Sequence, residues 1–149
     1  MRAVVQRVNA ARVEVGGEVV GAIARGLVAF VGAARGDEER DAAYLVEKLL
    51  TLRVFPGDDG KMSLALAEVS GGLLVISQFT VVGDVRRGRR PSFDDALAPD
   101  LARPLLERFV ALAAAGGVPV ASGRFGADMR VLVDNDGPVT LLLDSRKLF

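Results

Sequence analysis

The chain has 149 residues, half of them hydrophobic, and its 19 basic residues are balanced by 19 acidic ones. This balance excludes the bulk positive field that drives non-specific binding to nucleic acids, so any contact with RNA must be local. The absence of cysteine and histidine excludes disulfides, thiolate nucleophiles and zinc-thiolate sites, and it removes the commonest general base.

The length suits a single domain over residues 1–149 with one hydrophobic core. Every apolar run is interrupted too soon to cross a bilayer. The amino-terminal segment Arg2–Val8 has the pattern of a strand and lacks that of a signal peptide. We therefore expect a cytoplasmic protein that does not act at a membrane.

The amino-terminal part has the pattern of an antiparallel meander. β-branched residues are frequent in Arg2–Val8 and Ala11–Val15, and Gly16-Gly17 supplies a two-residue hairpin turn into a strand over Glu18–Ala24. The apolar run Leu27–Ala33 is too short for a typical helix and predicts a buried strand.

Two amphipathic helices are predicted from apolar residues at spacings of three and four. The first begins with Asp37 as its N-cap and ends near Arg53, and a short strand at Val54–Phe55 follows it. The second covers Asp100–Ala115 and is stopped by Gly116-Gly117. The predicted buried face of the second helix consists of Leu101, Leu105, Phe109 and Leu112.

Between these helices, the run Leu73–Val82 predicts a central strand that is interrupted by Ser77, Gln78 and Thr80. Buried polar groups cost free energy unless they are hydrogen-bonded, so this cluster either has partners within the fold or faces a ligand. The following segment, Gly83–Pro99, is long and aperiodic, which is typical of a functional loop. It carries a basic cluster made of Arg86, Arg87, Arg89 and Arg90.

The carboxyl-terminal part predicts two strands, Phe125–Val133 and Val139–Leu143, joined by a polar turn. Within that turn, Gly137-Pro138 is either an ordinary turn dipeptide or a cis peptide bond. We assign no role to the tail, Asp144–Phe149. The elements together predict an α+β fold, a curved and mostly antiparallel sheet or barrel with two helices packed on it.

Each polar feature also has an ordinary explanation when it is considered alone. The hydroxyls of Ser77 and Thr80 can bond to backbone, the arginine cluster can be a solvated loop, and Phe79 can belong to the core. The sequence contains no nucleophile elbow, phosphate-binding loop or dinucleotide fingerprint. The combination of features is more informative than any one of them.

In combination, the sequence closely resembles the D-aminoacyl-tRNA deacylases. Ser77-Gln-Phe-Thr80 and Asn135-Asp-Gly-Pro-Val-Thr140 look like the two signature motifs of that family. Other segments agree with the family in the same order across nearly the whole chain, with Gly126 standing where alanine is common: Gln6–Val8, Gly60–Met62, Arg87–Gly88, Arg90–Phe93, Gly123–Phe125 and Ala127–Met129.

The resemblance implies an enzyme that hydrolyses the ester between a D-amino acid and the 3′ acceptor end of tRNA, and that also removes glycine mischarged on tRNA. It implies a homodimer with active sites at the subunit interface. The Gly137-Pro138 peptide would be cis and reach into the partner's pocket, where backbone can exclude an L side chain sterically. Arg7 would brace this segment.

The resemblance also implies roles for the site residues. Ser77, Gln78, Phe79 and Thr80 would form the catalytic segment, in which N–H groups of Phe79 and Thr80 stabilise the oxyanion and the 2′-OH of the tRNA assists the attacking water. Phe125 and Met129 would form an apolar wall, and the arginine cluster is our candidate for phosphate contact. We expect no metal, no cofactor and no DNA partner.

Two alternatives remain open. The first is a relative with shifted specificity, acting on glycine or another small amino acid mischarged on tRNA. The second is a non-catalytic RNA-binding or structural dimer with the same fold. A purely structural dimer has no need of Ser77, Gln78 and Thr80 in one strand, which favours the enzyme.

Overall fold

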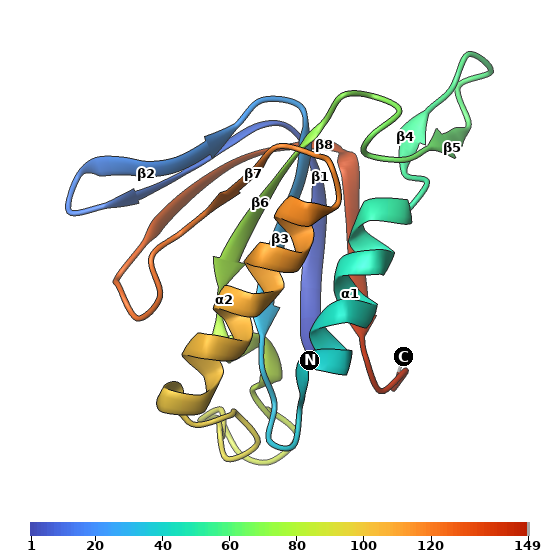
Figure 1. The fold of residues 1–149 in the computed structure, drawn as a ribbon. Helices are drawn as coiled ribbons and strands as arrows, with labels where there is room; N and C mark the ends of the chain where they lie inside the picture. Colours follow the sequence, from blue (N-terminus) through green and yellow to red (C-terminus); the bar gives the residue numbers. More distant parts are fainter. Residues whose placement is uncertain (149) are drawn as a thin grey trace.

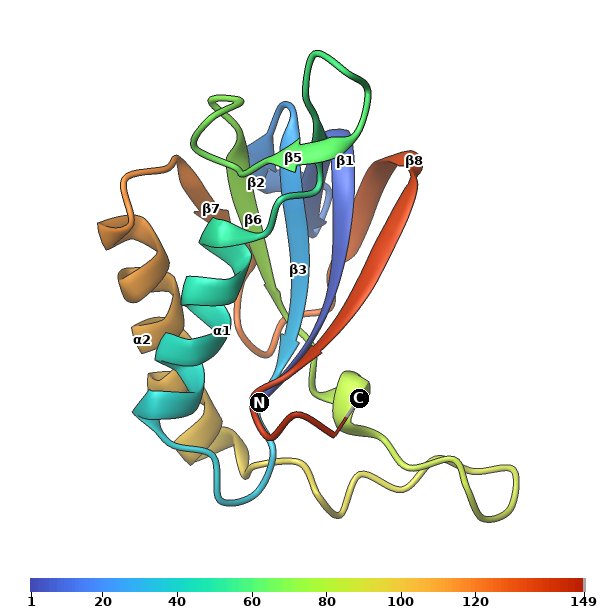
Figure 2. The same ribbon diagram turned by 90° about the vertical axis from the view of Figure 1, so that its right-hand side faces the viewer.

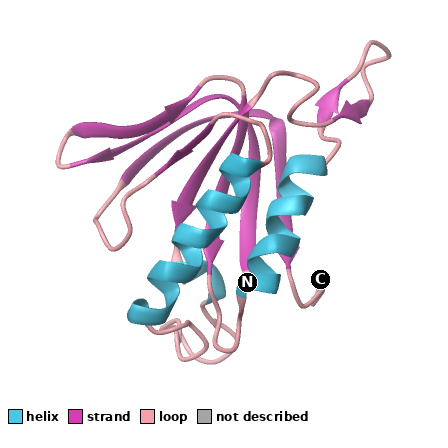
Figure 3. Ribbon diagram, in the orientation of Figure 1, coloured by secondary structure: helices cyan, strands magenta, loops and turns pink. Residues whose placement is uncertain are grey.

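A strongly curved, six-stranded sheet with two helices on one face forms the protein (Figure 1). The computed structural model describes residues 1–148. The strands of the sheet are β1 (Arg2–Val15), β2 (Glu18–Ile23), β3 (Gly26–Gly32), β6 (Gly72–Ser77), β7 (Val120–Ser122) and β8 (Arg130–Asp144). A separate small hairpin, β4 (Phe55–Pro56) and β5 (Met62–Leu64), projects from one end (Figure 3).

The long strand β1 organises this sheet because it pairs with three others. Its first half lies between β3 and β8, and its second half lies between β2 and β8, all antiparallel. The pairs β3–β6 and β6–β7 are parallel. The sheet is therefore mostly antiparallel, which confirms the fold class predicted from the sequence.

The sheet curls until β2 approaches β7 and nearly closes a barrel. A Cβ atom on Gly21 of β2 would lie 2.6 Å from the carbonyl oxygen of Ser122 in β7, so only glycine permits this approach. Inside the curl, a small core packs around Val8, Val13 and Val28. Because β6 and β7 are parallel neighbours, the carboxyl end of β6 and the segment after β7 lie at the same edge of the sheet.

Helices α1 (Glu39–Thr51) and α2 (Pro99–Ala115) lie side by side on one face of the sheet (Figure 2). The main core fills the space between them and the sheet. The buried face of α2 consists of Ala102, Leu106, Phe109 and Ala113. Of the predicted face, Phe109 is buried, and Leu105 and Leu112 pack partly buried against the core, whereas Leu101 is 57% exposed. The helix begins at Pro99, one residue before the predicted start.

The predicted central strand Leu73–Val82 was too long. Strand β6 ends at Ser77, and the chain turns into a short 3-10 helix, η1 (Phe79–Val82). The last ladder bond is donated by Gln78 N–H to the Val31 carbonyl at 2.8 Å, close to the end of the neighbouring strand β3. Because the partner strand stops at Gly32, the ladder cannot continue.

The carboxyl-terminal strands also differ from the prediction. Residues Phe125–Met129 form a turn that contains Gly126 with a φ of +75°, although their alternation predicts a strand. The short strand β7 was missed. The polar segment before Val139 does not reverse the chain, because both of its flanks belong to β8 and pair with β1.

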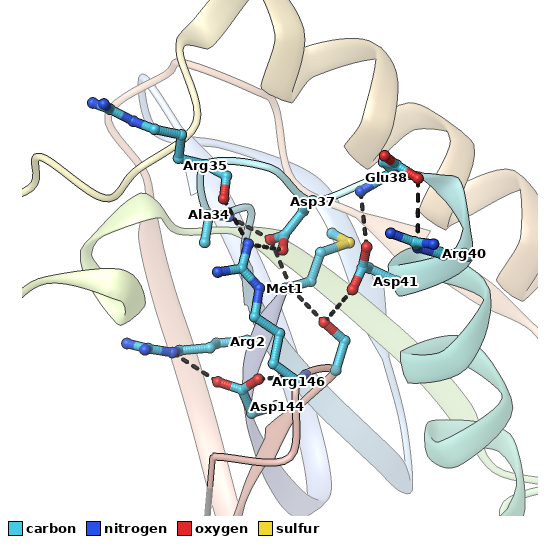
Figure 4. A network of polar contacts seen from close by, with 11 residues as sticks. Met1, Arg2, Ala34, Arg35, Asp37, Glu38, Arg40, Asp41, Asp144 and Arg146 are labelled. Carbon is cyan, nitrogen blue, oxygen red and sulfur yellow. Dashed lines mark hydrogen bonds and ion pairs between the residues drawn. The ribbon is translucent and has the colours of Figure 1, made fainter.

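Asp37 is not the N-cap of the first helix, as the sequence had predicted. Glu38 occupies that position, and its N–H bonds to Asp41 Oδ2 at 2.9 Å. The Asp37 side chain is fully buried, where Oδ2 lies 2.6 Å from the Met1 ammonium and accepts a bond from Ala34 N–H at 2.6 Å (Figure 4). Its other oxygen lies 2.9 Å from Nη2 of Arg146.

The tail therefore has a structural role that the sequence did not reveal. Ser145 Oγ accepts from the Met1 ammonium at 2.6 Å and donates to Asp41 Oδ1 at 2.7 Å (Figure 4). Burial alone raises the pKa of Asp41, but the bonds from Ser145 and Glu38 N–H and the nearby positive charges outweigh it and lower that pKa below 3.8. Of the tail, Phe149 lies outside the described residues.

Candidate active site

A cavity of about 700 Å³ opens where the curled sheet meets the start of α2. Five parts of the chain line it, and most of the lining side chains are apolar. They are Gly32 and Ala33 at the end of β3, the segment 77–80, the loop at residues 93 and 96–98, three residues of α2 (Pro99, Ala102 and Leu106), and the turn 125–129. A pocket of this size and character suits a small organic ligand.

The segment Ser77–Thr80 forms one wall of this cavity. Ser77 and Gln78 are half-buried, whereas Phe79 and Thr80 are exposed, so these residues do not lie in one buried strand. Gln78 Nε2 donates to Thr80 Oγ1 at 2.8 Å. The N–H groups of Phe79 and Thr80 begin η1 and donate to no other described residue, which leaves two donors available at the cavity wall.

Phe79 connects this wall to the long loop before α2. Its ring is 58% exposed and packs edge-on against Phe93, with 5.0 Å between centroids and 72° between planes. Phe93 also lines the cavity. Phe79 is therefore a surface aromatic at the mouth of the cavity and does not belong to the core.

Phe125 and Met129, on the turn before β8, also line the cavity. The structure thus brings six of the predicted site residues around one space: Ser77, Gln78, Phe79, Thr80, Phe125 and Met129. The sequence reasoning missed Leu106 and the Ala96–Pro99 wall. The helical spacing from Ala102 to Leu106 carried this signal, but the apolar stripe of α2 was placed one residue too early.

The Gly137-Pro138 segment does not line this cavity within one chain. Its peptide bond is cis, as the sequence resemblance had led us to expect. Partner pairs in the β1–β8 ladder run from Gln6–Thr140 to Val8–Asn135, so Arg7 alone faces the four residues Asp136–Val139. The segment is therefore a bulge that projects from β8.

Arg7, on the neighbouring strand β1, contacts this bulge through its side chain. Its side chain is largely buried, and Nη1 donates to the Val54 carbonyl at 2.6 Å. Nε lies 2.8 Å from Asp136 Oδ2, a charge contact that is not aligned as a hydrogen bond. Asn135 Nδ2 donates to the carbonyls of Arg7 and Val139 at 2.9 and 3.1 Å. The bulge is thus tied to β1 at its base.

The arginine cluster lies on an exposed loop that extends away from the helices (Figure 2). Arg86 donates through Nε and Nη2 to the Asp84 carboxylate at 2.9 and 2.7 Å, and this pairing holds the pKa of Asp84 far below its usual value. Arg87, Arg89 and Arg90 are exposed. None of the four arginines lines the 700 Å³ cavity.

Within residues 1–148, no group of three or more acidic side chains is arranged to hold a metal ion. None of the described helices is both long and apolar enough to span a membrane. The polar residues that line the cavity are Ser77, Gln78, Thr80 and Asp128, which carry two hydroxyls, one amide and one carboxylate.

Comparison with known proteins places this geometry in a family. The profile of the family described as D-Tyr-tRNA(Tyr) deacylase matches residues 4–144. The D-aminoacyl-tRNA deacylase of Sorangium cellulosum is 64% identical, and each chain is covered completely. The D-aminoacyl-tRNA deacylase of Geobacter sulfurreducens is 53% identical over 98% of this chain and 96% of its own.

Two solved structures share the fold. One, titled c-Myc DNA Unwinding Element Binding Protein, has a TM-score of 0.92 and 37% identity, covering 97% of this chain and 98% of its own. The other, titled a probable eukaryotic D-amino acid tRNA deacylase, has a TM-score of 0.79 and 19% identity, covering 96% and 98%. The second supports the fold alone.

Fold and cavity, together with these relatives, define a hydrolase of the aminoacyl-tRNA deacylase class. Within that class, the chain belongs to the D-Tyr-tRNA(Tyr) deacylase family. The family and the enzyme class predicted from the sequence, a D-aminoacyl-tRNA deacylase, are thereby confirmed.

Proposed function

We propose that this protein hydrolyses the ester of D-aminoacyl-tRNA in the cavity beside Ser77–Thr80, releasing the D-amino acid and free tRNA. The observation that carries the proposal is the convergence of the 77–80 and 125–129 segments on one apolar cavity of about 700 Å³. The whole chain acts as one deacylase domain. A cytoplasmic location and tRNA as the only nucleic-acid partner are parts of the same proposal.

The chemistry depends on positioning rather than on a protein nucleophile. Within the described chain, the one side-chain bond to Thr80 Oγ1 comes from the Gln78 amide, which is not a base. The free N–H groups of Phe79 and Thr80 supply the charge stabilisation that a tetrahedral oxyanion needs. The terminal 2′-OH of the tRNA then assists the water that attacks the ester.

Selection against L-amino acids falls to the bulge at Gly137-Pro138, supplied by a second subunit. Within one chain the bulge does not line the cavity, so it can act there only from another copy. Among the described residues β8 pairs only with β1, which leaves its other edge and the 58% exposed Leu142 without a neighbour. Long free edges are normally covered, which supports a homodimer.

Release of amino acids from three charged tRNAs tests the function. We expect D-tyrosine to be released from its tRNA much faster than L-tyrosine, because a steric filter rejects the L side chain. Glycine should also be released, since it has no side chain to reject. The assay measures free amino acid against time for each tRNA. Equal rates for D- and L-tyrosine would contradict the proposal, and release of glycine alone would favour shifted specificity.

Thr80→Ala should keep kcat for D-tyrosyl-tRNA within about tenfold of the unmodified protein, because its hydroxyl positions groups and does not attack the ester. Loss of a true nucleophile costs roughly 10⁴-fold or more, and a loss of that size would revive covalent catalysis. Thr51→Ala, an exposed threonine of α1, serves as the matched control. Replacing the terminal adenosine of the tRNA by 2′-deoxyadenosine should lower kcat of the unmodified protein far more than Thr80→Ala lowers it with the ordinary tRNA.

A further inference from the structure

A second cavity, of about 340 Å³, adjoins the first one between α2 and the segment that follows β7. The two cavities share three lining residues, Ser77, Leu106 and Phe125. Arg103 of α2 and Arg124 line the second cavity, and Glu107 is its one acidic residue. A ligand that fills the first cavity and continues past Phe125 therefore enters a space with a net charge of one positive unit.

The two arginines are available to bind an anion. The guanidinium of Arg103 lies over the ring of Phe125, with Cζ 4.7 Å from the centroid. Stacking of this kind holds the guanidinium plane while its N–H donors remain free at the edge. Neither Arg103 nor Arg124 forms an ion pair in the described part of the chain, whereas Arg86 in the exposed loop is paired with Asp84.

We propose that Arg103 and Arg124 bind the phosphate on the 5′ side of the terminal adenosine of the tRNA. This inference rests on the proposed function, because it assumes that the ester lies beside Ser77–Thr80. The next charged group along the RNA is then a phosphodiester, which guanidinium groups bind through paired N–H donors. The single net positive charge of the cavity matches the single negative charge of one phosphodiester.

This site would also explain how a protein without net charge recognises RNA. The 19 basic and 19 acidic residues give no bulk attraction, so affinity must come from a few local contacts. Phosphate contacts position a nucleic acid without reading its bases. Arg103 and Arg124 would therefore hold the acceptor end in register with the catalytic segment for any tRNA.

The test compares two small substrates, 3′-D-tyrosyl-adenosine with and without a 5′-phosphate. In the unmodified protein, KM should be about tenfold lower for the phosphorylated substrate, as expected for a charge-assisted contact. In the double variant Arg103→Gln with Arg124→Gln, this KM ratio should fall toward one. With D-tyrosyl-tRNA, the slope of log KM against log salt concentration should decrease by about 0.7 for each phosphate contact that is lost.

Arg108→Gln is the matched control, because Arg108 lies on the same helix, is exposed and pairs with Glu39 outside both cavities. It should keep the KM ratio of the unmodified protein. The side chains of Arg103 and Arg124 are exposed, so melting temperatures should change little, and the single variant Arg124→Gln gives a second reading if the double variant does not fold.

The outcomes separate this inference from the proposed function. Release of D-tyrosine with no effect of the 5′-phosphate would overturn the phosphate site and leave the deacylase function intact. If the double variant keeps the lower KM for the phosphorylated substrate, the phosphate site is likewise overturned and the deacylase function stands. Failure of the unmodified protein to release D-tyrosine from any of the substrates would instead overturn the proposed function.

Discussion

The substitution Gly137→Ala is expected to lower kcat/KM for D-tyrosyl-tRNA by about 100-fold. It should also lower the ratio of kcat/KM for D-tyrosyl-tRNA to kcat/KM for L-tyrosyl-tRNA. Gly137 has a φ of +116°, which residues with a side chain rarely adopt. An added Cβ would lie 2.9 Å from Val139 Cγ2 and 3.1 Å from both Val139 N and Arg7 Nη2. The bulge would therefore have to shift.

The shift would reach the proposed filter because the bulge is held from several sides. Arg7 is fixed by the Val54 carbonyl and contacts Asp136, so its guanidinium has little room to withdraw from a new methyl group. Asn135 ties both ends of the bulge through two carbonyls. Under the proposed dimeric arrangement, a displacement of about 1 Å there misplaces the backbone that excludes L side chains.

Gly117→Ala provides the matched control for this variant. Gly117 also has a positive φ, +81°, but a Cβ there would meet no atom within 4 Å. It should cost about 1 kcal/mol of stability through backbone strain while leaving the D/L ratio unchanged. If Gly137→Ala and Gly117→Ala release D-tyrosine and L-tyrosine from their tRNAs at equal rates, the bulge does not take part in selection against L-amino acids.

Local signals were sufficient to predict much of this fold. The Gly16-Gly17 hairpin, both helices and the buried strand β3 follow from turn chemistry and from the period of apolar residues. These signals act within one element and need no knowledge of its neighbours. They failed at Phe125–Met129, where an alternating pattern predicts a strand but Gly126 takes a positive φ and turns the chain.

The bulge shows where local signals are insufficient. Gly137-Pro138 has the composition of a reversing turn, yet the segments on both sides pair with the same strand, β1. Whether a turn sequence reverses the chain or bulges from a strand depends on what its flanks pair with, and that is a long-range property. Likewise, the polar residues Ser77, Gln78 and Thr80 are evident in the sequence, but the departure of this segment from the strand depends on where β3 ends.

Contacts between the two ends of the chain were beyond sequence reasoning for the same reason. Asp37 before a helical pattern is typical of an N-cap, and nothing local indicates that it pairs with Arg146 and the Met1 ammonium. The polar tail likewise resembles a loose end. Only the fold, which puts both ends of the chain beside the start of α1, shows that these groups neutralise each other (Figure 4).

Asp37→Ala is therefore expected to lower the free energy of unfolding by about 3–5 kcal/mol, the usual cost of removing one partner of a buried ion pair. The Met1 ammonium and the Asp37 side chain are both fully buried. Without the carboxylate, the ammonium would remain buried with no opposite charge beside it and no access to water. The Ala34 N–H would also lose its acceptor. Thermal unfolding should show a melting temperature lower by about 10 °C.

Asp37→Asn and Glu39→Gln separate charge from shape. Asparagine keeps an oxygen for the Ala34 N–H and removes only the charge. The melting temperature of Asp37→Asn should therefore lie between those of the unmodified protein and Asp37→Ala. Glu39 pairs with Arg108 while both side chains are more than half exposed, so Glu39→Gln should cost less than about 1 kcal/mol. If Asp37→Ala melted as the Glu39→Gln control does, the buried network would contribute no net stability, because desolvation of its charges would cancel their attraction.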